Sequence, residues 1–135
     1  MGLAERRGIK DFQDKHFIGH KAEIDEAAGF EVPLDVDWDS IAAPGYGHMY
    51  DIAFAKVYFQ PLVLAFRDVC RDEMGRTALG AGLTRVAIKN SDRFYGGDSV
   101  ACDEGVLTID HKPVTNIDDV QIRAEAIVRL LEERL

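Results

Sequence analysis

Hydrophobic and polar residues alternate along residues 31–40, which read EVPLDVDWDS. Successive side chains of a strand point to opposite faces, so this period of two predicts a half-buried strand. The apolar face carries Val32, Leu34, Val36 and Trp38. The other face carries Glu31, Asp35, Asp37 and Asp39. We therefore expect the apolar set to enter the core and the aspartates to share an outward, acidic face.

Two longer segments have the period of an α-helix. Residues 3–28 place one stripe of side chains on a common face, and Gly29 follows as a left-handed C-cap. That stripe consists of Ile9, Phe12, His16, His20, Ile24 and Ala27. Residues 48–73 are apolar on nearly every face, which predicts a helix in the core or at a subunit interface. Pro61 should kink or split this helix, and Gly75 is expected to end it.

The period returns to two in the last third of the chain. Residues 84–89 alternate, with their apolar members facing inward. Residues 99–103 and 106–110 flank Glu104-Gly105, a two-residue turn that predicts a β-hairpin.

A final helix is expected to begin at Thr115 or Asn116 and to run to the end of the chain. The resulting order, α-β-α-β-β-β-α, predicts the α+β class. We expect a single domain over residues 1–135, with a four-stranded, mostly antiparallel sheet packed against helices.

The composition is acidic. The 135 residues carry 24 Asp plus Glu against 16 Lys plus Arg, a formal net charge of −8. Such a surface repels phosphate groups, so we expect no nucleic-acid and no membrane partner. It suits a cationic partner, a cation or plain solubility.

The predicted location is cytoplasmic. No apolar run opens the chain, and the longest charge-free stretch, residues 57–66, is half of a membrane span. Cys70 and Cys102 lie far apart and outside any metal-ligand spacing. We expect reduced core cysteines, with a disulfide between them as the alternative.

Asp35, Asp37 and Asp39 have the D-x-D-x-D spacing that opens a calcium loop. The rest of that loop is missing, because Ser40 stands where glycine is needed and Tyr46 where glutamate is needed. The three carboxylates therefore suit a solvated or edge-protecting face, a protein-binding face for a basic partner, or part of a metal site.

His16 and His20 are four residues apart, so both rings fall on one helical face. This spacing suits two ligands of a transition metal, although the glutamate of the HExxH motif is absent. Asp37, Asp39, His48 or Asp51 are candidates to complete such a site. The alternatives are a pair of histidines at the rim of the core, bonded to backbone or carboxylate groups, and a pH-sensitive contact.

No complete catalytic motif occurs in the chain, and no cofactor is predicted. The favoured hypothesis is a non-enzymatic, cytoplasmic protein-interaction or regulatory module with an acidic strand face, which binds a basic protein or forms a homodimer. The alternative is a small metal-binding protein or hydrolase that uses His16 and His20 with strand carboxylates. A third hypothesis is a small-molecule pocket lined by aromatic side chains, Trp38, Tyr46, Tyr50 and Tyr58.

Overall fold

The structure is a computed structural model that describes residues 1–96 and 98–135. Its N-terminal part is one long helix made of α1 (Leu3–Phe12), a π-helical turn (Gln13–Phe17) and α2 (Ile18–Ala28). The helix ends at Gly29, whose φ of +84° confirms the predicted left-handed C-cap.

The π-helical turn shifts the buried face of this helix. A π turn takes up one extra residue, so Phe17 and not His16 follows Phe12 on the inner face. Phe12 is buried and Phe17 is half-buried, whereas His16 is exposed. The predicted stripe is therefore correct for Ile9, Phe12 and Ile24 and wrong for His16.

The predicted strand over residues 31–40 is shorter than expected. Strand β1 covers only Leu34–Val36, and the chain then turns into a short helix, α3 (Trp38–Ile41). The Asp37 side chain accepts a hydrogen bond from the Ser40 amide at 3.3 Å and so caps α3. Alternation predicts a strand here, but the local capping bond ends it.

The apolar segment forms a second long helix. A 3₁₀ turn (Gly47–Met49) leads into α4 (Tyr50–Phe54), a π-helical turn (Ala55–Phe59) and α5 (Gln60–Val69). Pro61 lies in the first turn of α5, directly after the π turn, where a missing N–H is tolerated. The proline therefore coincides with an irregular turn, and the helix continues through it.

Helix α6 (Glu73–Gly82) follows after a short turn. Asp72 caps it by accepting a hydrogen bond from the Gly75 amide at 2.8 Å. The expectation that Gly75 ends a helix is wrong, because this glycine lies in the first turn of α6.

The sheet contains β1, β2 (Arg85–Lys89), β3 (Val100–Asp103) and β4 (Val106–Asp110) in the order β1-β2-β4-β3. Strand β2 pairs in parallel with both β1 and β4, and only β3 and β4 are antiparallel. The α+β class is confirmed, but the prediction of a mostly antiparallel sheet is wrong.

The hairpin explains this difference. Glu104 and Gly105 both have positive φ, +52° and +80°, as a tight two-residue turn requires, so the hairpin itself is confirmed. After β2, the chain does not form the neighbouring strand but enters β3, one position further along the sheet. The hairpin then returns the chain, so that β4 lies between β2 and β3. An alternating pattern predicts which face of a strand is buried but not which strand lies next to it.

Helix α7 (Val120–Arg134) begins later than predicted. The preceding residues form a loop in which Asn116 has a φ of +52°. The carbonyl oxygens of Asn116 and Ile117 both accept hydrogen bonds from the buried Arg123 guanidinium, each at 2.7 Å. These bonds hold the backbone in a loop and delay the helix.

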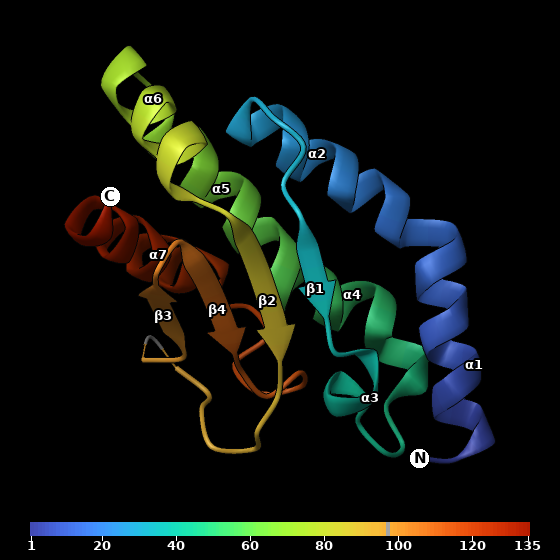
Figure 1. The fold of residues 1–135 in the computed structure, drawn as a ribbon. Coiled ribbons are helices and arrows are strands. Elements are labelled where there is room, and N and C mark those ends of the chain that lie inside the picture. The colour runs from blue at the N-terminus through green and yellow to red at the C-terminus, as the bar shows by residue number, and fades with distance from the viewer. Residues whose placement is uncertain (97) are drawn as a thin grey trace.

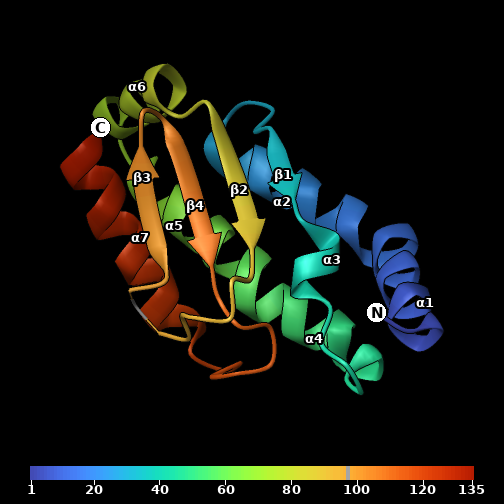
Figure 2. The same ribbon diagram turned by 60° about the horizontal axis from the view of Figure 1, so that its bottom comes forward.

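The molecule has two layers. Figures 1 and 2 show α2, α5 and α7 together on one side of the sheet, and no helix or strand of the described residues lies over the opposite side. The row Leu34, Val86, Leu107 and Cys102 and the row Val36, Ile88, Ile109 and Val100 run across the strands in register. Both rows belong to the hydrophobic core or pack against it. Within the described residues, no helix is long and apolar enough to cross a membrane.

Candidate functional site

The predicted acidic residues do not share one strand face. Asp35 is the member that lies within the sheet, where its side chain is 73% exposed and pairs with Arg85 at 3.2 Å. Asp37 caps α3, and Asp39 lies exposed in the first turn of that helix. The charge of Asp35 is also compensated by its neighbour, so the continuous acidic strip expected from the sequence is absent.

The two histidines have different surroundings. His20 is half-buried, and its ring stacks on Phe59 with centroids 5.4 Å apart and on Phe12 at 5.8 Å. Burial lowers the pKa of His20. The negative charge of the nearby Glu23 acts in the opposite direction, but its effect is smaller. This ring therefore belongs to the aromatic part of the core.

His16 is exposed and lines a hollow of about 200 Å³. His48 and Asp51 line the same hollow, so the structure brings together three of the residues that the sequence suggested for a metal site. Among the residues that the structure describes, however, no group of three or more His, Cys, Asp or Glu side chains is arranged to hold a metal ion.

The aromatic side chains near the first strand are packing residues. The Tyr50 hydroxyl accepts from the Ala43 amide at 2.8 Å, and the Tyr58 hydroxyl donates to the His111 carbonyl oxygen at 2.6 Å. Both tyrosines are almost fully buried. Trp38 packs against Phe17 with centroids 5.2 Å apart. Tyr50, Tyr58 and Trp38 therefore pack in the core or against it, whereas Tyr46, the fourth residue of the predicted aromatic pocket, is 44% exposed.

The uncovered face of the sheet is the first of two candidate sites. Its central row crosses the sheet in register as Asp35, Ala87, Thr108 and Ala101. A second row contains Arg85, Val106 and Asp103. The centre of the face is therefore made of small side chains, and charged side chains of both signs surround it.

The second candidate lies at the carboxyl ends of the three parallel strands, the lower end in Figure 1. Three loops line a hollow of about 340 Å³ there, one after each of β1, β2 and β4. The lining residues are Ser40, Ala42, Ala43, Pro44, Asn90, Ser91, Asp92, Lys112, Pro113, Val114 and Thr115.

Buried polar residues support this end of the sheet. Asp110 is nearly buried, and its carboxylate accepts a hydrogen bond from the Ser91 amide at 2.8 Å. His111 has no exposed surface, and its Nδ1 lies 2.6 Å from the Lys112 carbonyl oxygen. A carbonyl oxygen only accepts, so Nδ1 carries the proton and donates.

Burial also shifts the pKa of two groups at this end of the sheet. It lowers the pKa of His111, while the hydrogen bond to the Lys112 carbonyl raises it and the charge of Arg123 lowers it further. Burial raises the pKa of Tyr58, and the Asp110 carboxylate adds to that effect. In the sequence, the one signal for these buried polar residues is an alternating strand that runs into Asp110.

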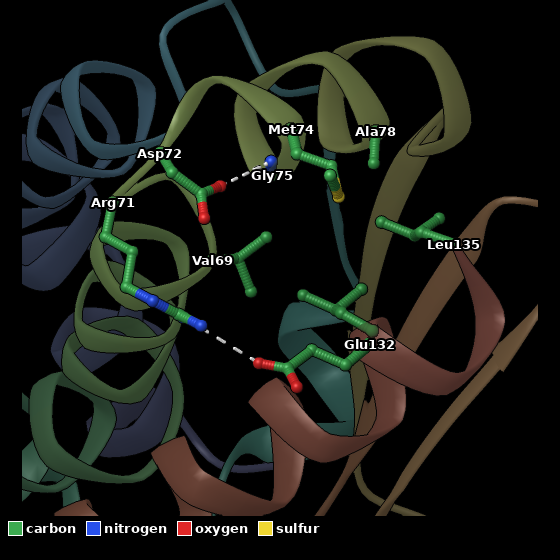
Figure 3. Close-up of a pocket in the computed structure, with 9 residues that line it drawn as sticks. Val69, Arg71, Asp72, Met74, Gly75, Ala78, Glu132 and Leu135 are labelled. Atoms are coloured by element: carbon green, nitrogen blue, oxygen red, sulfur yellow. Dashed lines mark hydrogen bonds and ion pairs between the residues drawn. The ribbon is translucent and has the colours of Figure 1, made fainter.

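A third hollow lies at the opposite end of the sheet, between the α5–α6 corner and the end of α7. Figure 3 shows its apolar wall, which includes Val69, Ala78 and Leu135, with Met74 at the rim. An ion pair between Arg71 and Glu132, 3.8 Å apart, crosses one side of it. Its volume is about 340 Å³.

Comparison of the chain with protein-family models, with curated proteins and with solved structures finds no match. Function is therefore argued from the geometry alone.

Proposed function

We propose that this protein is a protein-interaction module that acts through the uncovered face of its sheet, and that this face pairs with a second copy of the chain. The uncovered face is the observation that carries the proposal (Figure 2). Sheets made only of parallel strands occur almost always with both faces covered, whereas antiparallel sheets can leave one face open. Here two of the three strand pairings are parallel, yet α2, α5 and α7 cover one side only.

The charge pattern of the face supports a second copy as the partner. Arg85, Val106 and Asp103 lie side by side on β2, β4 and β3. A two-fold axis parallel to β4 places each Arg85, which also pairs with Asp35 of its own copy, opposite Asp103 of the second copy. The same axis places each Val106 opposite its own equivalent. A two-fold interface needs this kind of self-complementary pattern.

The central row of the face is also self-complementary about this two-fold axis. Ala87 and Ala101 lie on either side of Thr108, so each alanine would face the other alanine of the second copy. Side chains this small let two sheets approach closely, as face-to-face packing at about 10 Å requires.

The proposed dimer is weak. Three overlapping strands of about five residues cover roughly 14 Å by 17 Å, well below the ~800 Å² per partner of stable complexes. We therefore expect a concentration-dependent equilibrium. A basic partner is less well supported, because Arg85 already compensates Asp35 and the face carries both signs of charge.

Sedimentation velocity from about 10 µM to about 1 mM tests the dimer. We expect Arg85→Asp and Asp103→Arg each to abolish self-association, because each places like charges opposite one another. The double variant restores the opposite-charge pairs and should restore the dimer. Arg129→Asp, on the exposed side of α7, is the control and should leave it unchanged.

Two results would contradict the proposal. One is a wild-type chain that stays monomeric over the whole concentration range. The other is a double variant that associates no better than either single variant.

We also propose that the protein resides in a reducing compartment such as the cytoplasm. Cys70 and Cys102 are both free thiols, which agrees with the prediction of reduced cysteines.

A further inference from the structure

The hollow at the carboxyl ends of β1, β2 and β4 has the position and size of a ligand site. In open sheets, ligands bind outside the carboxyl ends of parallel strands, where loops on a rigid scaffold converge. Its volume of about 340 Å³ suits a small molecule. The residues of this hollow are separate from the uncovered face of the sheet, so the inference does not depend on the proposed dimer.

The hollow lies in a region with unpartnered buried polar atoms. Within the described residues, four buried side-chain atoms lack a hydrogen-bond partner: Ser91 Oγ, Ser99 Oγ, His111 Nε2 and Arg123 Nε. Of these residues, Ser91 follows β2 and lines the hollow, whereas Ser99 and His111 lie at the same end of the sheet outside the lining. Buried polar atoms are nearly always paired, so the exception at Ser91 in the wall of a hollow points to a ligand.

The lining is rich in hydrogen-bond donors. The Asn90 side-chain oxygen already accepts from the Asp92 amide at 2.9 Å, which leaves the donor end of that amide group. Ser91 and Thr115 add hydroxyl groups. The Lys112 ammonium group lies over the ring of Tyr95, 5.8 Å from its centroid. None of the ion pairs among the described residues involves Lys112, so no carboxylate neutralises its charge in a chain of net charge −8.

Backbone bonds hold these donors in place. The Ser91 amide donates to Asp110, and the Asn90 amide donates to the Ser40 hydroxyl at 3.1 Å. The Lys112 amide donates to the Phe94 carbonyl oxygen at 2.9 Å. The three loops are thus fixed to one another, which lowers the entropy cost of ligand binding.

We infer that this hollow binds a small carboxylate with a short apolar body. Lys112 and Ser91 hold the carboxylate by charge-assisted hydrogen bonds. The apolar body lies against Pro44, Pro113 and Val114, which form the non-polar part of the lining.

A carboxylate fits this lining better than a phosphate does. The hollow offers one ammonium group, and the Asp92 carboxylate also lines it. A phosphate dianion needs more positive charge than one lysine beside an aspartate supplies.

Titration of the ¹⁵N-labelled protein followed by amide chemical shifts tests the inference. Pentanoate is the probe, its neutral analogue pentanamide is the matched control, and inorganic phosphate tests the other anion class. We expect pentanoate to shift the amides of Asn90, Ser91 and Lys112–Thr115. Pentanamide should bind at least about tenfold more weakly, because a hydrogen bond to a charged group is lost.

Two variants identify the cation. Lys112→Gln removes the positive charge, keeps a polar side chain and should weaken pentanoate binding at least about tenfold. Lys10→Gln removes an exposed lysine of α1 and should leave it unchanged. The amide spectrum also reports whether each variant is folded. A further variant, Ser91→Ala, removes one hydroxyl group from the same site and is a smaller perturbation.

Three outcomes would overturn the inference. They are equal binding of pentanoate and pentanamide, shifts produced by phosphate but not by pentanoate, and pentanoate binding that Lys112→Gln does not weaken. The dimer is tested separately, because Arg85→Asp should leave pentanoate binding unchanged.

Discussion

Two glycines of the same helix are expected to respond oppositely to alanine. A Cβ atom built on Gly75 would lie 2.8 Å from the Val69 carbonyl carbon and closer still to its oxygen. Both of those atoms belong to the backbone, so no side chain can move aside. On Gly80, also in α6, a Cβ atom would meet nothing within 4 Å.

The magnitudes follow from these surroundings. Gly80 is an exposed helical residue, so Gly80→Ala should stabilise the protein by about 0.5–1 kcal/mol. In Gly75→Ala the corner between α5 and α6 must open by roughly an ångström, and we expect a loss of about 2–3 kcal/mol. The two variants should therefore differ by about 3 kcal/mol, although their change in composition is identical.

Urea unfolding at 25 °C, followed by far-UV circular dichroism and by Trp38 fluorescence, measures both free energies. Thermal melts should agree, with the Tm of Gly80→Ala higher by about 2–4 °C and that of Gly75→Ala lower by about 8–12 °C. A Gly75→Ala protein as stable as wild type would refute the contact between the start of α6 and Val69. A destabilised Gly80→Ala protein would refute the open surroundings of that residue.

Three further predictions concern the buried polar residues. Because burial lowers the pKa of His111, the unfolded chain takes up a proton near pH 6.5 that the folded chain does not. The free energy of unfolding should fall as the pH drops below about 6.5, and His111→Gln should flatten this dependence in urea titrations at several pH values. An unchanged pH dependence in this variant would contradict the burial of the imidazole. Tyr58→Phe removes a buried 2.6 Å hydrogen bond and should cost about 1–2 kcal/mol by the same assay, whereas an unchanged stability would contradict the bond. Arg123→Met leaves three backbone carbonyl oxygens without their donor, so we expect a loss of about 2–4 kcal/mol and faster amide exchange in residues 115–119.

The local elements were largely predictable from the sequence. The Gly29 cap, strand β2 with Val86 and Ile88 inward, and the hairpin at Glu104-Gly105 are confirmed. Each depends on residues close together in the chain, where periodicity and turn chemistry act directly.

The errors arose where a single local event changes the register. The π turn before Phe17 moved His16 from the core to the surface, and the Asp37 cap ended the strand on which three carboxylates were expected. A π turn has no clear sequence signal. The helix cap at Asp37 does have a sequence signal, an Asp-x-x-Ser pattern, but the stronger hydrophobic alternation of the surrounding residues obscured this pattern.

The candidate sites required the tertiary structure. Residues of the hollow come from three loops, among them Ser40, Ser91 and Lys112, which only the parallel strand order brings together. The uncovered face likewise depends on which strands are neighbours and on where the helices pack. Neither property is contained in the period of any one strand.

The parallel pairing of β1 with β2 also affects how the chain folds during synthesis. Leu34 pairs with Val86, which is made 52 residues later, whereas Asp103 and Val106 of the hairpin are three residues apart. At ribosomal rates the interval between Leu34 and Val86 lasts about 3–10 s. In the last part of that interval, after Val69 is made, the apolar helix Tyr50–Val69 has no sheet to cover it. Slower translation between residues 70 and 86 would lengthen that exposure, and we expect it to lower the yield of folded protein without altering the native structure.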